Sequence, residues 1–289
     1  MRQEAARLGE VVRYGASVEG RELYAVTVGD GPTPLVVTAA IHGLEYIGVR
    51  VALAVLGRGP IPGATLWVVP TVNPDAYDRT WAVDGDAPVS QLRKNARGVD
   101  LNRNFPLPFG SRTAPIGLAG SHSPRSATFR GPTPLSEPET EALTSLLERI
   151  GPHGAVSQHA FMGAVIPARV TRPGDWFGYS RLCAAFRRGQ LDRVRYARLS
   201  SPIDVFTGEL EDWLHHALGC WAVCVESFRI DESLRQHLRA PTSFWRFNPR
   251  APDPIVERDA RGVRALLTAM TEAPPLPVRP RARTFRPRW

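Results

Sequence analysis

A histidine and a glutamate lie three positions apart in the stretch VVTAAIHGLEYIG (residues 36–48). The apolar run before His42 is typical of a strand buried on both faces. Two further apolar runs end in the same residue types, AVSQH at His159 and WAVCVE at Glu226. Imidazole nitrogens and carboxylate oxygens bind zinc and act as general bases. Each residue alone is also compatible with a hydrogen-bonded structural role at a strand end.

The strand-end positions predict that these side chains meet. In open α/β sheets, ligands bind outside the carboxyl ends of the strands, so three such strands direct their polar residues into one crevice. His42, Glu45 and His159 supply two imidazoles and one carboxylate, which is the ligand number of a catalytic zinc site. A buried carboxylate needs a partner, and Glu226 would remain to act as the base.

His153 is a rival ligand, six positions before His159. It follows Gly-Pro ahead of the predicted strand, and we interpret it as a loop residue. The other histidines lack a strand-end position and are interpreted as surface or helix residues: His122, His215, His216 and His237.

Apolar runs of strand length alternate with longer segments of helical period, which predicts a three-layer α/β/α fold. Its mixed, mostly parallel, twisted sheet would be flanked by helices. The predicted strands are residues 23–29, 34–40, 65–70, 155–159 and 221–226. The predicted helices are residues 45–57, 136–150, 175–189, 209–219 and 254–273.

Two segments carry further expectations. Residues 104–134 are rich in Pro, Gly and Ser, and a loop of this length is expected to form part of a cleft wall. Ser136 and Glu139 have the spacing of a capping box, which predicts a helix start at Ser136.

The composition is that of a globular chain, with 43% hydrophobic residues among 289. No run approaches the roughly 20 apolar residues of a membrane span. The first residues lack a hydrophobic signal segment, and the three cysteines form no C-x-x-C pair. These features predict a cytoplasmic protein that does not act on membranes.

The net charge of +8 comes largely from arginine, and residues 274–289 contain five arginines. We divide the chain into a catalytic domain, residues 1–273, and a Pro/Arg-rich tail, residues 274–289. A solvated tail is favoured over a nucleic-acid contact, since no nucleic-acid-binding motif accompanies it. No specific nucleic-acid partner is therefore expected.

The stretch QLRKNARGVDLNRNFP (91–106) resembles the zinc-dependent M14 carboxypeptidases, and so do AAIHGLEYIG, FRGPTPLSEPETEAL and LEDWLHHALGCWAVCVES. The motifs occur in the order and spacing of that family, from residues 15–29 to Phe228. The resemblance implies the family's mixed α/β fold and one Zn²⁺ per chain. The metal ligands it implies are His42, Glu45 and His159.

The resemblance also implies roles for four other residues. Glu226 matches the general base that takes a proton from the metal-bound water and returns it to the leaving amine. Arg93 matches the arginine that stabilises the oxyanion. Asn102 and Arg103 match the pair that holds the terminal carboxylate of the substrate, for which a planar guanidinium is well suited.

The sequence departs from the family at a mobile tyrosine that closes over the substrate. The matching position is Asp204, and the nearest tyrosine is Tyr196, further upstream. Relatives that act on murein peptides or small acylated amino acids also vary here, so the resemblance leaves an exopeptidase and an amidase both open.

Glu211 occupies the position that forms the base of the pocket for the terminal side chain. A carboxylate there favours a cationic group, such as Arg, Lys or the amine end of diaminopimelate, and Glu209 would add to this preference. Alternatively, both acids occupy a solvated first helical turn, where the helix dipole favours them.

The leading prediction is a zinc carboxypeptidase of a bacterial, intracellular type without a pro-segment, which releases a C-terminal residue with a tilt toward basic or amine-bearing side chains. The alternatives with the same centre are a murein peptide amidase that cuts γ-D-glutamyl–diaminopimelate bonds and a small N-acyl amino acid deacylase. A non-catalytic binding module that uses the Arg-rich tail is the third hypothesis. The sequence leaves the oligomeric state open.

Overall fold

This computed structural model describes residues 1–107, 117–170, 172–191, 196–198 and 206–277. The described residues are built around a mixed β-sheet. Within these residues the sheet has eight strands in the order β1-β2-β4-β3-β5-β8-β6-β7. The strands are β1 Glu10–Ala16, β2 Glu22–Val28, β3 Thr33–Ala39, β4 Ala64–Val69, β5 Gly154–Ala160, β6 Ala164–Pro167, β7 Ala197–Arg198 and β8 Trp221–Ser227.

The centre of the sheet is parallel. β4, β3, β5 and β8 pair in parallel in that order, and β6 pairs in parallel with β7. β1, β2 and β4 form antiparallel pairs at one edge, and β6 is antiparallel to β8 near the other. Four of the seven pairings are thus parallel, which confirms the predicted mixed, mostly parallel sheet.

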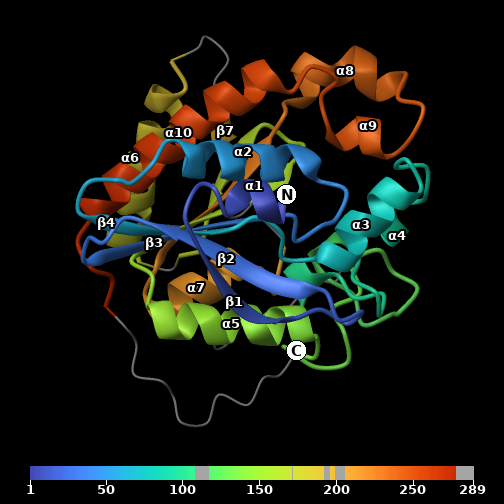
Figure 1. Cartoon of the computed structure of the whole chain (residues 1–289), viewed down its shortest axis with the longest axis horizontal. Coiled ribbons are helices and arrows are strands. Elements are labelled where there is room, and N and C mark those ends of the chain that lie inside the picture. Colours follow the sequence, from blue (N-terminus) through green and yellow to red (C-terminus); the bar gives the residue numbers. More distant parts are fainter. Residues whose placement is uncertain (108–116, 171, 192–195, 199–205, 278–289) are drawn as a thin grey trace.

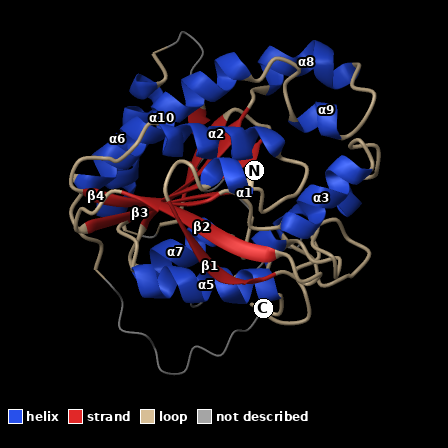
Figure 2. Ribbon diagram, viewed as in Figure 1, coloured by secondary structure: helices blue, strands red, loops and turns tan. Residues whose placement is uncertain are grey.

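Helices cover both faces of this sheet (Figures 1 and 2). α2, α6 and α10 lie together on one face, whereas α5 and α7 lie on the other. The longer helices are α2 Tyr46–Gly57, α3 Pro74–Ala82, α5 Pro138–Ile150, α6 Pro173–Gly189, α7 Leu210–Leu218, α8 Ile230–Leu238 and α10 Asp253–Thr271. The shorter ones are α1 Arg2–Ala5, α4 Val89–Arg93, α9 Phe244–Phe247, and the 3₁₀ turns η1 Leu101–Arg103 and η2 Gly117–Ala119.

The predicted capping box at the start of α5 is wrong. The helix begins at Pro138, and the residue at its N-cap, Glu137, makes no side-chain cap hydrogen bond. The Glu139 side chain instead accepts hydrogen bonds from Val18 N (3.0 Å) and Asn95 Nδ2 (3.1 Å). Long-range contacts have therefore replaced the local ones that the spacing favoured.

The stretch after α10 remains in contact with the core as far as the structure describes it. Leu276 is buried, and the Pro274 carbonyl accepts a hydrogen bond from Trp221 Nε1 (2.9 Å). Residues 278–289, which hold the arginines of the predicted tail, lie outside the described residues. Among the helices that are described, none has the length and apolar character needed to cross a bilayer.

Candidate metal centre and active site

Three neighbouring parallel strands bring the predicted site residues to one edge of the sheet. β3, β5 and β8 are adjacent. His42 follows the end of β3, and His159 on β5 is the register partner of Glu226 on β8. Register partners on adjacent parallel strands point to the same face, so Glu226 stands beside His159 at the carboxyl end of the sheet.

His42, Glu45 and His159 form a compact group of possible metal ligands. The Glu45 carboxylate lies between the rings, with Oε1 2.7 Å from His42 Nδ1 and Oε2 3.0 Å from His159 Nδ1. One ligand atom from each residue lies within 4.8 Å of the others, and all three side chains are buried. Two imidazoles and one carboxylate suit a zinc ion that keeps a position open for water.

The turn that follows His42 is packed tightly against α3. A Cβ on Gly43 would lie 2.3 Å from the carbonyl carbon of Ala76, so a larger residue here would push the helix away. The Asn73 side chain donates a hydrogen bond to the Ile41 carbonyl (3.3 Å). The backbone that presents His42 is therefore fixed by contacts from the next segment of the chain.

The Nε2 atoms of both histidines, which point away from Glu45, are held by other side chains. His42 Nε2 lies 3.2 Å from Asp100 Oδ1, and His159 Nε2 lies 3.1 Å from Ser157 Oγ. Partners of this kind fix the orientation of a ligating imidazole. Both rings consequently turn Nδ1 toward Glu45, which brings the possible ligand atoms of the three residues together.

Asp100 was not among the residues predicted from the sequence, although it lies within the quoted motif GVDLNRNF. Its Oδ2 accepts a hydrogen bond from Arg93 Nε (2.8 Å), and its Oδ1 accepts one from Asn102 N (3.1 Å). Burial opposes its ionisation, but Arg93 and His42 hold the pKa of this carboxyl well below its usual range. Asp100 thus links Arg93, the candidate donor to the oxyanion, to His42 of the candidate metal centre.

The two site carboxylates differ in their charge preference. Burial opposes ionisation of Glu45, but the two histidines lower its pKa to about 2. Burial and repulsion from Glu45 raise the pKa of Glu226 to about 8, against the opposing effect of Arg93. Glu45 is therefore held ionised, as a metal ligand should be, and Glu226 has the raised pKa that a proton-transferring carboxylate would have.

Arg103 and Asn102 lie in the buried turn η1, and both are engaged within the protein. Arg103 Nη1 donates to Glu209 Oε1 (3.1 Å) and to the Asn102 carbonyl (2.7 Å), and its guanidinium lies 4.8 Å from the Phe206 ring centre. Asn102 Oδ1 accepts a hydrogen bond from Leu210 N (3.1 Å). Glu209 therefore pairs with Arg103, which differs from the expectation that it adds to a cation-binding pocket.

The interpretation of Glu209 and Glu211 as residues of a solvated helical turn is wrong. Only 6% of Glu209 and 2% of Glu211 are exposed. The Glu211 charge also contributes to the raised pKa of Glu226, after burial and Glu45, so it lies within electrostatic reach of the centre. Both acids are therefore buried, and Glu209 is already paired with Arg103.

Tyr196 does not have the position of a mobile tyrosine. It is fully buried, and its hydroxyl accepts hydrogen bonds from Phe228 N (3.0 Å) and Arg258 Nη2 (3.0 Å) and donates one to Asp259. Phe228 has a positive φ of 67°, so Tyr196 supports the strained turn that follows Glu226 on β8. Asp204 lies outside the described residues.

His153 lies in the loop before β5, as predicted. Its Nε2 lies 2.9 Å from the Met270 carbonyl and 3.1 Å from that of Ala273, where it joins the strand to the end of α10. The loop at residues 104–134 reaches the site near Arg103, whose Nε donates to the Leu118 carbonyl (3.3 Å). Residues 108–116 of that loop lie outside the described residues.

The fold and the three possible metal ligands define an α/β protein with a candidate metal centre at the carboxyl edge of its sheet. The sequence profile of the zinc carboxypeptidases, peptidase family M14, matches residues 62–233, which is more than half of the chain. The chain therefore belongs to the zinc carboxypeptidase family. The matched segment includes His159 and Glu226, whereas His42 and Glu45 precede it.

Two curated relatives illustrate the range of the family. The chain is 31% identical over 193 residues to a metallocarboxypeptidase A-like protein of Trichophyton verrucosum, across 60% of this chain and 40% of the relative. It is 30% identical over 162 residues to murein peptide amidase A of Escherichia coli K12, across 55% of this chain and 62% of the relative. The chain thus spans about half the length of these relatives.

Solved structures show the same fold. Bovine thrombin-activatable fibrinolysis inhibitor matches with a TM-score of 0.75 and 21% identity, over 94% of both chains. Murein-tripeptide amidase of Escherichia coli O157 matches with a TM-score of 0.51 and 26% identity, over 85% of this chain and 97% of that structure. Carboxypeptidase A of Helicoverpa armigera matches with a TM-score of 0.72 and 20% identity, over 94% of this chain and 71% of that one.

Proposed function

We propose that the protein is a zinc-dependent hydrolase that removes a C-terminal amino acid from a peptide and prefers a basic terminal residue. The observation that carries the proposal is the buried group of His42, Glu45 and His159 with Glu226 in register beside it. Family membership supports the choice of zinc, which His42, Glu45 and His159 would hold as one ion per chain. A bound Zn²⁺ supplies Lewis acidity and lowers the pKa of a water molecule.

Glu226 is the proposed general base. Its raised pKa makes it a stronger base than an ordinary glutamate, so it can take a proton from the attacking water and deliver it to the leaving nitrogen. Arg93 is the proposed donor to the oxyanion that develops on the scissile carbonyl. Its Nε is fixed by Asp100, which leaves its Nη groups as the donors for the substrate.

The amino acid that is released would bind on the side of the catalytic group where η1 and α7 lie. We propose that Asn102 and Arg103 hold its carboxylate and that Glu211 contacts its cationic side chain. The pairing of Arg103 with Glu209 keeps the guanidinium in place before the substrate arrives. A buried acid such as Glu211 attracts a cationic side chain and repels an anionic one.

A murein peptide amidase is the second candidate. The similarity to murein peptide amidase A of Escherichia coli K12 favours it. Diaminopimelate carries both a carboxylate and a distant amine, so the proposed contacts of Arg103 and Glu211 suit it as well. A small N-acyl amino acid deacylase would use the same centre, but no contact in the described residues favours it over the other two.

A panel of substrates separates these reactions. Zinc-loaded protein is offered peptides that end in Arg, Lys, Leu or Glu, a murein tripeptide and an N-acetyl amino acid, and the released amino acids are quantified. We expect the peptides that end in Arg or Lys to be cleaved with the highest kcat/KM. Cleavage of the murein tripeptide alone would favour the amidase and reject the carboxypeptidase.

The Glu211→Gln variant tests the basis of the preference. We expect it to lower the ratio of kcat/KM between Arg-terminal and Leu-terminal peptides by about 30-fold, since losing one partner of a buried charge pair costs at least about 2 kcal/mol. Glu141→Gln, an exposed acid on α5, is the matched control. An unchanged ratio in Glu211→Gln would show that another group selects the terminal residue.

A further inference from the structure

The turn that follows Glu226 contains a residue in an unfavourable backbone conformation. Phe228, two positions after the proposed base, has a φ of 67°. A bulky residue in the left-handed region is an outlier, and it persists only where surrounding contacts hold it there. Phe228 connects β8 to α8, so the contacts that hold it also hold the end of the strand that carries Glu226.

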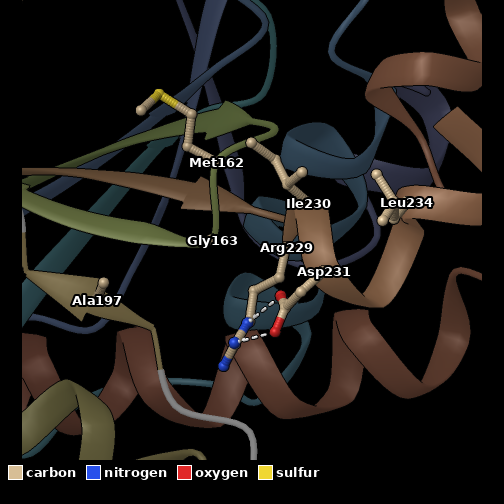
Figure 3. Close-up of a pocket in the computed structure, with 7 residues that line it drawn as sticks. All are labelled: Met162, Gly163, Ala197, Arg229, Ile230, Asp231 and Leu234. Carbon is tan, nitrogen blue, oxygen red and sulfur yellow. Dashed lines mark hydrogen bonds and ion pairs between the residues drawn. The ribbon is translucent and has the colours of Figure 1, made fainter. Parts of the chain in front are cut away.

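The outer side of this turn faces a pocket beside β6 (Figure 3). Gly163 and Ala197 line one wall of the pocket, and Arg229, the residue after Phe228, lines another. Gly163 packs closely on the turn, since a Cβ there would lie 2.8 Å from the Arg229 Cα. Because the pocket leaves space on this side, the contacts that fix the Phe228 backbone must come from its buried side.

A cluster of four polar side chains meets the buried side of the turn: Gln190, Tyr196, Arg258 and Asp259. They come from the end of α6, from the residue before β7 and from α10. Phe228 N donates a hydrogen bond to the Tyr196 hydroxyl (3.0 Å), which donates in turn to Asp259. Asp259 Oδ1 also accepts hydrogen bonds from Gln190 Nε2 (3.0 Å) and Arg258 Nε (3.1 Å).

This cluster is almost completely removed from water. Gln190, Tyr196 and Asp259 have no exposed surface, and Arg258 is 5% exposed. Apolar residues of similar volume often stabilise a core as well as a buried ion pair does, so stability alone does not account for such a cluster. A network whose hydrogen bonds are mutually supporting does, however, fix the position of each group within it.

The cluster lies on the face of the sheet opposite the Glu226 side chain. Val223 and Val225 of β8 pack in the same core as residues of α6 and α10. Successive side chains of a strand point to opposite faces, so Glu226 points away from that core. The cluster therefore cannot contact a substrate at Glu226, and any effect on the reaction must pass through the backbone of β8.

We propose that Tyr196, held by Asp259, is a positioning residue for the general base. Its hydroxyl keeps Phe228 in the left-handed conformation, which sets the direction of the Glu226 carboxylate relative to the metal centre. Without this hydrogen bond the turn would relax to an ordinary φ and rotate the end of β8. The inference rests on the proposed function and adds to it the group that orients its base.

Tyr196→Phe tests the inference, because it removes only the hydroxyl. Tyr179→Phe is the matched control. Tyr179 is also fully buried, and its hydroxyl also accepts a hydrogen bond from the backbone of β8, from Ala222 N (3.0 Å). Ala222 lies four positions before Glu226, near the start of the strand, so the control alters the same kind of contact away from the site.

The three proteins are zinc-loaded and assayed on an Arg-terminal peptide, well below the unfolding temperature of each. We expect Tyr196→Phe to lower kcat by about 10–100-fold, because a displacement of about 1 Å at a reacting group can reduce the rate by about 100-fold. Its KM and zinc content should equal those of the wild-type protein. Both variants should lower Tm by similar amounts, whereas Tyr179→Phe should keep the wild-type kcat.

Gln190→Met provides a second, milder test. It removes one donor to Asp259 and leaves the Tyr196 hydroxyl in place. We expect kcat to fall by about threefold at constant KM, which corresponds to the contribution of one ordinary hydrogen bond. If Tyr196→Phe did not fold, this variant would decide the question, and a wild-type kcat in Gln190→Met would then overturn the inference.

Three other results bear on the inference. An unchanged kcat in Tyr196→Phe, an equal loss of kcat in both tyrosine variants, or a change confined to KM would overturn it. The proposed function would stand in each case, provided that the wild-type protein is active and Glu226→Gln is not. If the wild-type protein cleaved none of the peptides, the proposed function and this inference would be overturned together.

Discussion

Glu226→Gln is expected to lower kcat by roughly 10²–10⁴-fold while the protein keeps its metal, because an amide of the same shape cannot accept a proton. Glu226 stands beside His159 in the strand register but is not part of the ligand group. The substitution therefore removes the base without removing a ligand. Steady-state kinetics on an Arg-terminal peptide and zinc analysis of the same sample provide the two readouts.

The pH dependence provides a check on the same residue. The base must be ionised, so kcat/KM should rise with pH through the pKa of Glu226. Without metal that pKa is raised from 4.5 to about 8, and a nearby dication favours the carboxylate and lowers it. The acidic limb should therefore have its midpoint between these values and disappear in Glu226→Gln.

Glu141→Gln, at an exposed position on α5, serves as the control and should leave both the rate and the pH profile unchanged. If Glu226→Gln kept more than a tenth of the wild-type kcat with its acidic limb intact, another group would have to be the base.

Arg93→Ala is expected to lower kcat by about 10²–10³-fold with little change in KM, because an oxyanion contact forms fully only in the transition state. Arg93 has a second contact, since its Nε donates to Asp100, the partner of His42. Zinc content must therefore be measured in the variant, so that loss of metal is not mistaken for loss of the oxyanion donor.

Arg97→Ala is the matched control for this experiment. It lies four positions further along the same segment, and 56% of its side chain is exposed. We expect its kinetics to equal those of the wild-type protein. A rise in KM at constant kcat in Arg93→Ala would contradict the oxyanion role and indicate a contact made equally in the ground state.

The strands that carry the site could be predicted because their burial leaves a strong signal in the sequence. The run at 34–40 is observed as β3 at Thr33–Ala39, and the run at 221–226 as β8 at Trp221–Ser227. β5 is buried at every position. Strands covered on both faces need continuous apolar residues, and such runs end where the polar site residues begin.

The edges of the sheet could not be predicted in the same way. β1 is half-exposed along most of its length, and β6 has four residues. Neither presents a periodic pattern long enough to separate it from a loop. The positions of β1 and β6 are set by pairing with strands that are distant in the sequence. The pocket beside β6 could therefore not be predicted from the sequence.

Within the site, residue types could be predicted but their partners could not. Asp100 meets His42 across 58 positions, and Arg103 meets Glu209 across 106. No local spacing encodes contacts of this length, because they exist only once the sheet is assembled. Glu211 shows the consequence, since the helix-dipole interpretation and the buried-pocket interpretation fit the sequence equally well.

Metal analysis of the purified protein tests the central claim most directly, namely that His42, Glu45 and His159 chelate one zinc ion. Protein prepared without chelators should contain about one zinc per chain, and His159→Ala should contain far less, because two of three protein ligands rarely retain zinc. His122→Ala, an exposed histidine, is the control and should keep its metal. Wild-type protein that binds no transition metal even after zinc is added back, or His159→Ala protein with a full complement of zinc, would contradict the account.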